Sequence, residues 1–291
     1  MDQIRLKAMA KINLGLDVVR RREDGYHEVR MIMQNVYLYD NIFMKKIGDD
    51  EIKVSTNLHF LPTNENNLVY KAAKLLKDEF DLKSGVFIEL NKHIPVAAGM
   101  AGGSSDAAAV LYGMNKLFSL HLSEQELMKR GVKIGADVPY CIMRGTALSE
   151  GIGEILTALP PMPRCPILIA KPAISVSTKY VYENLHANEL QRHPDIDGIV
   201  AAIKAEDIHG VASRLENVLE TVTEKEYPVI TQLKDFMKAH GALNAIMSGS
   251  GPTVFGIYDQ EETAQAAYRE LKSAGLAKQV FLTETFNARR D

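Results

Sequence analysis

The segment PVAAGMAGGSSDAAA, residues 95–109, gathers glycine, alanine and serine around a single charged side chain, Asp106. It follows an apolar run, GVFIEL, and continues into an alanine-rich helical stretch that reaches about Phe118. Glycine lets backbone N–H groups come close to phosphate oxygens, and a helix N-terminus adds partial positive charge there. This order of strand, small residues and helix is typical of an anion site. A tight turn before a closely packed helix has the same composition.

The segment matches neither of two common nucleotide-phosphate motifs. No lysine follows its glycines, so the P-loop pattern is absent, and the G-x-G-x-x-G pattern of dinucleotide sites is absent too. A second glycine segment, GSGPTV at residues 249–254, fails the dinucleotide pattern at its last position. Composition therefore indicates a phosphate site without identifying the ligand.

Two further sets of polar residues could bind a ligand or transfer a proton, namely the pair Lys11 and Asn13 and the single residue Asp137. Lys11 and Asn13 share the polar face of an alternating run, Ile4–Val18, one pleat repeat apart, so both side chains could reach one ligand. Asp137, in GADVPYC, has little polar company and could accept a proton. Both have structural alternatives, because a lysine in mid-strand is usually solvated and Asp137 could cap a helix with Pro139 in its first turn.

The elements that must position these groups follow from periodicity. The alternation over residues 4–18 predicts a long strand, and the turn RRREDGY joins it to a second extended run from His27 to about Phe43. Helical spacing predicts a helix after the capping residues of NENN, with apolar positions from Leu68 to Phe80. Ser123 and Glu126 form a capping box for another helix that ends near residue 131.

A change of composition predicts two domains. The segment LPPMPRCP holds four prolines within eight residues, which is typical of a crossing between domains. We expect an α+β domain over residues 1–158 and a second α+β domain over residues 159–291. The second contains strands at ILIAKP, NAIMSGS, TVFGIY and KQVFLTETF, and a helix at EETAQAAYRELKSAG.

Composition excludes several classes of function. The chain has 291 residues with a net charge of −3 and a pI near 6.3, which argues against a protein that binds nucleic acid and against one that binds membranes through a polybasic segment. Cys141 and Cys165 are too few for a disulfide framework and lack metal-ligand spacing. No signal-peptide core and no membrane-spanning apolar stretch is present. We expect a cytoplasmic protein that binds small molecules, with an oligomeric state that the sequence leaves open.

Three segments taken together are much more specific than any one of them. AKINLGLDVVRRREDGYHEV, PVAAGMAGGSSDAAAVL and MSGSGPTVFG occur in this order, with GADVPYC between the last two. The chain resembles the GHMP kinase superfamily over essentially its whole length. AKINL and DGYHE narrow the resemblance to members that phosphorylate a cytidyl alcohol of the non-mevalonate isoprenoid pathway. One departure is Met9, where those members usually have proline.

The resemblance implies a two-domain α+β GHMP kinase fold with the active site in the cleft between domains. ATP would phosphorylate the 2-hydroxyl of the cytidyl substrate. Asp137 matches the general base, and Lys11 matches the group that polarises the acceptor. The positions that match ATP-binding residues are Pro95, Val96, Ala97, Ala98, Gly99, Met100, Ala101, Gly102, Gly103, Ser104, Ser105, Asn67 and Leu68. The positions that match substrate-binding residues are Asn13, Tyr26, His27, Gly249, Ser250 and Gly251.

The implied roles at the substrate have structural alternatives. Tyr26 would stack on cytosine and His27 would bond the base edge, although an aromatic residue after a D-G turn often only covers the hairpin and a lone histidine is often structural. Ser248–Gly251 could be a simple β-turn. ATP chemistry also implies Mg²⁺, which takes few protein ligands, and no residue is assigned to it.

Two alternative functions remain open at this point. The first is a GHMP kinase that acts on homoserine or mevalonate. The motif DGYHE argues against it, because such enzymes have no reason to carry this motif. A non-catalytic sensor with this fold is the other. Retention of both Lys11 and Asp137 counts against the sensor, because a pure binder gains little from a lysine–carboxylate pair.

Overall fold

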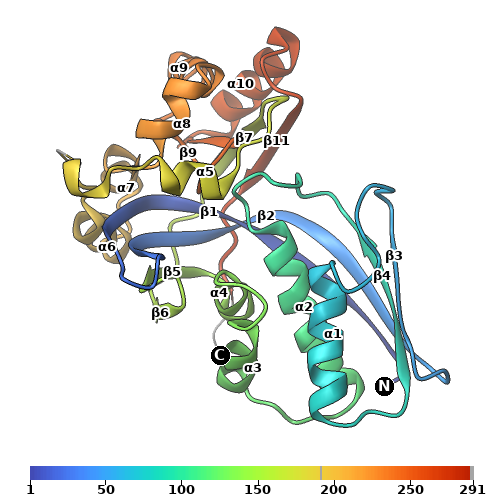
Figure 1. Cartoon of the computed structure of the whole chain (residues 1–291). Helices are drawn as coiled ribbons and strands as arrows, with labels where there is room; N and C mark the ends of the chain where they lie inside the picture. The colour runs from blue at the N-terminus through green and yellow to red at the C-terminus, as the bar shows by residue number, and fades with distance from the viewer. Residues whose placement is uncertain (191, 289–291) are drawn as a thin grey trace. The chain divides into compact units, whose positions relative to one another are not determined.

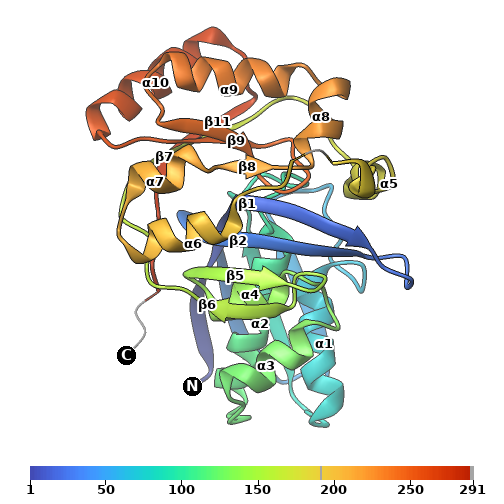
Figure 2. The same cartoon turned by 90° about the vertical axis from the view of Figure 1, so that its left-hand side faces the viewer.

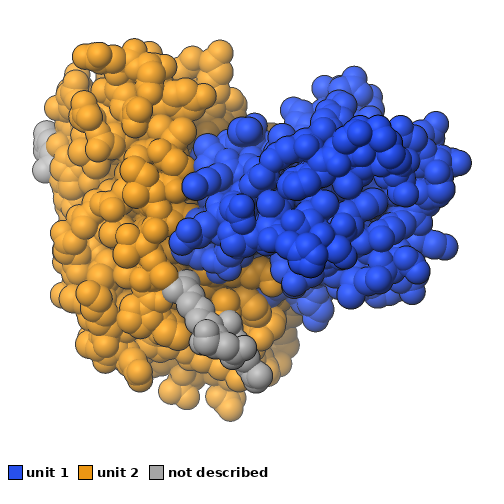
Figure 3. Space-filling model, turned by 90° about the horizontal axis from the view of Figure 1, so that it is seen from below, with its two compact units in different colours: residues 1–10, 38–96, 101–143 blue, residues 11–37, 97–100, 144–291 orange. Residues whose placement is uncertain are grey.

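The computed structural model describes residues 1–190 and 192–288, which divide into two compact units that interleave along the chain. Figure 3 colours the units. Unit 1 comprises residues 1–10, 38–96 and 101–143, and unit 2 comprises residues 11–37, 97–100 and the chain from Arg144 onward. Each unit contains several separate stretches of chain, so the two units do not test the predicted domain boundary after residue 158. That boundary stays a prediction.

Two long strands, β1 (Gln3–Arg21) and β2 (His27–Ile47), contribute residues to both units. They confirm the predicted opening hairpin. In unit 1, β4 (Gly85–Asn91) pairs antiparallel with the second half of β2 and parallel with β3 (Ile52–Thr56). The sequence did not predict β3.

Four helices complete unit 1. They are α1 (Leu68–Glu79), α2 (Gly102–Leu117), α3 (Glu124–Gly131) and α4 (Val138–Met143). Helices α1 and α2 lie side by side (Figure 1), and α4 packs against both α2 and α3. The predicted capping box is present, with the Ser123 side chain accepting from the Glu126 N–H and the Glu126 carboxylate accepting from the Ser123 N–H.

The alanine-rich composition of α2 has a packing reason. Most of its residues are buried, including Ala107, Ala108 and Ala109. A Cβ added at Gly113 would lie 2.3 Å from the Met44 sulfur on β2, so the helix and the sheet are already in close contact. Small side chains allow this approach, because larger ones would force backbone shifts.

Unit 2 contains strands that belong to two sheets. The first half of β2 pairs with β5 (Thr146–Glu150), which pairs with β6 (Ile155–Ala158), and β1 pairs parallel with β8 (Glu216–Asn217). The second sheet has the antiparallel order β11-β7-β10-β9. Its strands are β7 (Pro166–Lys171), β9 (Asn244–Met247), β10 (Val254–Ile257) and β11 (Gln279–Glu284).

Helices α9 and α10 cover one face of this second sheet (Figure 2). The helical segments of unit 2 are α5 (Thr178–Glu183), η1 (Ala187–Glu189), α6 (Ile196–Lys204), α7 (Ile208–Ser213), α8 (Glu220–Glu226), α9 (Val229–Ala239) and α10 (Glu261–Ala274). The predicted α+β class is confirmed. Among the described residues, no helix combines the length and the apolar character needed to cross a membrane.

Candidate active site

Lys11 and Asn13 lie on β1, and their side chains are in contact. The Lys11 Nζ donates to Asn13 Oδ1 at 2.7 Å and to the Gly99 carbonyl at 3.3 Å. Both side chains are buried, so the hypothesis that Lys11 is merely a solvated strand residue is wrong. The predicted shared face is confirmed, since the two residues one pleat repeat apart are in direct contact.

The Gly99 carbonyl also accepts the Ser248 hydroxyl at 2.9 Å, so the loop at residues 97–100 contacts the predicted third glycine segment. Gly99 has a φ of +70°, and a Cβ there would lie 2.1 Å from the Ser248 carbonyl oxygen. Gly249 also lies close to Gly99, because a Cβ added at Gly249 would lie 3.3 Å from the Gly99 Cα. Only glycine fits at position 99 without moving the backbone.

Two residues that sequence reasoning missed hold this turn in place. Asn217, on β8, donates through Nδ2 to the carbonyls of Met247 and Gly249, both at 2.8 Å. The Thr178 and Ser250 hydroxyls are hydrogen-bonded at 2.7 Å. The turn at residues 248–251 is therefore fixed by side chains. A strand of only two residues gave no periodic signal by which Asn217 could have been found.

The rest of the small-residue segment forms a helix N-terminus in unit 1. The segment was expected to be a loop to residue 105, but α2 already begins at Gly102, after Ala101 in the left-handed conformation. The first intrahelical bond joins the Ser105 N–H to the Ala101 carbonyl, and no side chain caps the helix. The N–H groups of Gly102, Gly103 and Ser104 therefore precede the helix's own hydrogen bonds, as in anion sites.

The remaining loop positions have distinct environments. Pro95, Ala98 and Met100 are buried, Val96 is half-buried, and Ala97 is exposed with a positive φ. The Met100 carbonyl accepts the Lys11 N–H at 3.1 Å, which ties the loop to β1.

The predicted adenine-side residues lie next to the start of α2. A Cβ added at Gly103 would lie 3.3 Å from Leu68 Cδ1, so those two positions are neighbours in unit 1. Asn67 is the N-cap of α1: its Oδ1 accepts from the Val69 N–H at 3.0 Å and its Nδ2 donates to the Pro62 carbonyl at 2.7 Å. Its side chain therefore has a structural role.

Asp137 immediately precedes α4 and is partly exposed. Within the part of the chain that the structure describes, its carboxylate makes no hydrogen bond and no ion pair. The alternative that Asp137 caps the following helix through its side chain is therefore not supported. The carboxylate is free to accept a proton or a donor from a ligand.

His27 lines a cavity of about 180 Å³ in unit 2. Its ring centroid lies 5.1 Å from that of Tyr182, which also lines the cavity with Arg21. Burial lowers the pKa of His27, and the Arg21 charge lowers it further, so the imidazole is neutral at pH 7. Tyr26 is 61% exposed and does not line this cavity. Sequence reasoning missed Tyr182, which is separated from His27 by more than 150 residues.

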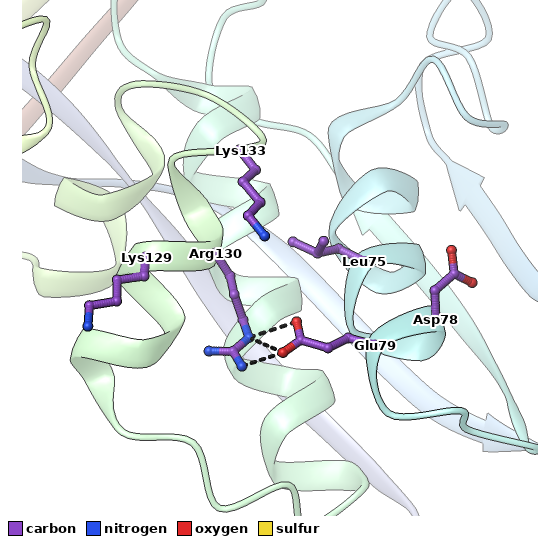
Figure 4. A pocket seen from close by; sticks show the side chains of 6 residues that line it. All are labelled: Leu75, Asp78, Glu79, Lys129, Arg130 and Lys133. Atoms are coloured by element: carbon purple, nitrogen blue, oxygen red, sulfur yellow. Dashed lines mark hydrogen bonds and ion pairs between the residues drawn. The ribbon is translucent and has the colours of Figure 1, made fainter.

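A second hollow, of about 500 Å³, lies between α1 and α3 in unit 1 (Figure 4). Arg130 and Glu79 form a paired contact within it, with Nε 2.9 Å from Oε2, while Lys129 and Lys133 carry further positive charge. None of the predicted site residues lines it. It lies toward the C-terminal end of α1, whereas Asn67 and Leu68 lie at the other end.

The described residues contain no group of three or more histidine, cysteine, aspartate or glutamate side chains that could hold a metal ion. The Ser105 hydroxyl is buried and donates to the Met9 carbonyl at 2.7 Å.

The family comparisons agree with this arrangement. The pattern described as GHMP kinases N terminal domain matches residues 67–145, and that described as GHMP kinases C terminal matches residues 199–277. The chain belongs to the GHMP kinase family. The predicted enzyme class, an ATP-dependent small-molecule kinase, is confirmed by this membership.

Curated relatives of this GHMP kinase match it over almost its whole length. A 4-diphosphocytidyl-2-C-methyl-D-erythritol kinase of Lachnospira eligens is 62% identical, covering 98% of this chain and 99% of the relative. A protein of the same name from Clostridium perfringens is 50% identical, with the same coverage of both chains.

Solved structures confirm the predicted GHMP kinase fold. A crystal structure of 4-(cytidine 5'-diphospho)-2C-methyl-D-erythritol kinase has a TM-score of 0.84 and 29% identity, covering 98% of this chain and 100% of that one. A homoserine kinase from Cytophaga hutchinsonii has a TM-score of 0.78 at 19% identity, covering 99% and 95% of the two chains. At that identity the second match shows the fold alone.

The contact at Gly99 predicts that Gly99→Ala destabilises this GHMP kinase more than Gly275→Ala. Gly275 has a φ of +67°, close to that of Gly99, but a Cβ there meets nothing within 4 Å. Both variants carry the left-handed penalty of about 1–2 kcal/mol. Gly99→Ala adds an overlap with the Ser248 carbonyl, for which we expect about 1–3 kcal/mol more. Urea unfolding measures both, and equal losses would contradict the contact.

Proposed function

We propose that this GHMP kinase transfers the γ-phosphoryl group of ATP to the 2-hydroxyl of 4-diphosphocytidyl-2-C-methyl-D-erythritol, producing the 2-phosphate and ADP in non-mevalonate isoprenoid biosynthesis. The observation that carries the proposal is the full-length similarity, at 50–62% identity, to curated kinases of that name. The DGYHE motif supports the same substrate, because it places His27 beside a cavity suited to one ring of a ligand.

The N-terminus of α2 would bind the triphosphate. The N–H groups of Gly102, Gly103 and Ser104 precede the first intrahelical bond and have no partner among the described residues, so phosphate oxygens would accept from them. Leu68 lies beside Gly103 and would border the adenine. Asn67 would support the adenine site by capping the N-terminus of α1, which carries Leu68. Bound ATP supplies the phosphoryl group.

Asp137 would act as the general base. Its carboxylate has no partner among the described residues, so it can accept the proton of the 2-hydroxyl as that oxygen attacks. Lys11 would stabilise the negative charge that develops on the acceptor and the transferred group. Its ammonium is held by Asn13 and by the Gly99 carbonyl, which fixes its position before substrate binds. Gly249, Ser250 and Gly251 would form part of the acceptor site.

His27 and Tyr182 would bind the cytosine. The cavity of about 180 Å³ is smaller than the roughly 300–1,000 Å³ that encloses a whole ligand, so it would accept a single ring. A neutral imidazole nitrogen can accept a hydrogen bond from the exocyclic amino group of cytosine, which uracil lacks. Tyr182 would offer a ring face, and the exposed Tyr26 would cover the base from the hairpin.

Mg²⁺ would arrive with the nucleotide. This ion tends to keep several waters and to bind substrate phosphates, with few protein ligands. We assign no protein residue to it.

A direct test measures ADP release from ATP with three alcohols, namely the cytidyl substrate, homoserine and mevalonate. We expect release with the cytidyl substrate alone, and a ³¹P NMR signal from a phosphomonoester at the 2-position. Turnover of homoserine or mevalonate instead would assign the chain to another GHMP activity. Absence of ADP release with all three would favour a sensor.

Asp137→Asn should lower kcat by about 10²–10⁴ with little change in stability, because the amide keeps the shape but cannot accept the proton. A matched control is Asp235→Asn on α9, where the carboxylate pairs with Lys238 on the surface. Steady-state kinetics and thermal unfolding measure both effects. Near-normal turnover of the Asp137 variant would remove it from the role of base.

The pKa of His27 predicts an acid limb in substrate binding. Because burial holds this pKa below the usual 6.5, His27 is neutral at pH 7 and becomes charged only as the pH falls further. An imidazolium cannot accept from the cytosine amino group, so KM for the cytidyl substrate should rise as the pH falls through the lowered pKa of His27. His27→Gln keeps an acceptor that does not titrate, and its KM should stay flat at low pH.

Saturating ATP removes the nucleotide's own titration from this measurement. His209→Gln, at an exposed histidine on α7, serves as the control and should keep the acid limb. An unchanged acid limb in His27→Gln would exclude His27 as the group that reads the base.

A further inference from the structure

A cluster of three buried charged groups lies beside the first turn of α2. The Lys92 ammonium contacts the carboxylates of Asp40, on β2, and of Asp106, on α2, the latter at 2.7 Å. The exposed fractions are 8% for Lys92, 0% for Asp40 and 2% for Asp106. One cation therefore faces two carboxyl groups that have almost no access to water.

The carboxyl group of Asp40 has more hydrogen-bond donors than that of Asp106. Asp40 Oδ1 accepts from the N–H groups of His93 and Ile94, at 2.5 and 2.8 Å. Asp106 Oδ1 has no hydrogen-bond partner among the described residues. A buried carboxylate without donors is costly, so Asp106 is the group that gains most by holding a proton.

The electrostatics of the cluster agree with this geometry. Burial raises the pKa of Asp106, the Lys92 ammonium lowers it, and the Asp40 charge raises it again, with a result of about 8. Burial lowers the pKa of Lys92, but the two carboxyl groups raise it more, so the lysine stays charged. One lysine, one carboxylate and one carboxylic acid make the cluster neutral.

Among the described residues, the Lys92 ammonium is the only cation that pairs with Asp106. Helices α1, α3 and α4 pack against α2, and several charged side chains of α1 and α3 pair with groups outside the cluster. These pairs are Lys74 with Asp78, Lys77 with Asp50, and Arg130 with Glu79. Helix α4 brings the buried Tyr140 and Cys141, and on β2 the Lys46 ammonium lies over the Phe118 ring. Lys92 and Asp40 are the charged groups that act on Asp106.

The cluster lies next to the N-terminus of α2. A Cβ added at Gly102 would lie 3.1 Å from the Lys92 Nζ, and Asp106 is the fifth residue of α2. A second negative charge at this position would oppose any anion bound by the first-turn N–H groups. A neutral Asp106 leaves that field favourable.

We propose that Asp106 is a positioning residue that stays protonated at neutral pH, and that its ionisation weakens binding of a nucleotide's phosphates at the N-terminus of α2. The inference rests on the proposed function in that it takes this helix start as the phosphate site. Burial and the Asp40 charge hold the proton on Asp106, because the Lys92 ammonium that opposes them is shared with Asp40.

Isothermal titration of the full chain with ADP, from pH 7 to pH 9, tests the proposal. If only the protonated form binds, about one tenth of the molecules are competent one unit above the pKa, so the wild-type Kd should rise about tenfold by pH 9. Asp106→Asn, which is neutral at every pH, should bind ADP with a Kd that changes little over this range. Asp78→Asn on α1 is the matched control and should keep the wild-type rise.

A second measurement needs no variant. The side-chain carboxyl ¹³C resonance of Asp106 in the wild-type protein should titrate near pH 8, and titration near the ordinary aspartate value of about 4 would overturn the proposal. Parallel Kd profiles for the wild type and Asp106→Asn would overturn it as well. Absence of ADP binding at every pH would instead contradict the proposed function, while the ¹³C titration would still decide the protonation of Asp106.

Discussion

One carbonyl oxygen, that of Gly99, organises the site in unit 2. It accepts both the Lys11 ammonium and the Ser248 hydroxyl, so a strand, a loop and a distant turn are fixed relative to one atom. This requires a residue without a Cβ and with a positive φ, because any side chain would overlap the Ser248 carbonyl. The lysine is thereby oriented by the backbone before any ligand binds, which lowers the reorganisation that catalysis requires.

The small-residue segment satisfies two separate requirements, and the two hypotheses about it apply to different residues. Gly99 and the left-handed Ala101 shape the turn, and Gly102 and Gly103 begin a helix whose first N–H groups have no partner among the described residues. The alanines from residue 107 onward pack α2 closely against its neighbours. Phosphate binding and tight packing therefore use successive parts of one segment.

Local patterns in the sequence were sufficient for the longer elements and for residues on a shared face, whereas the short strand β3 gave no clear pattern. Alternation placed Lys11 and Asn13 side by side, and the capping box located α3. Contacts between distant residues could not be predicted in this way. Asn217 lies on a strand of two residues, Tyr182 meets His27 from another helix, and Lys92 reaches Asp40 across 52 positions. Such pairings depend on tertiary packing, for which one sequence carries no periodic signal.

The central claim is that the N-terminus of α2 binds the nucleotide phosphates. Backbone ¹⁵N amide shifts on addition of ATP test it most directly, because each N–H group reports its own hydrogen bond. We expect the largest shifts at Gly102, Gly103 and Ser104. Shifts concentrated at Lys129, Arg130 and Lys133, which line the basic hollow between α1 and α3, with the α2 amides unmoved, would contradict the account.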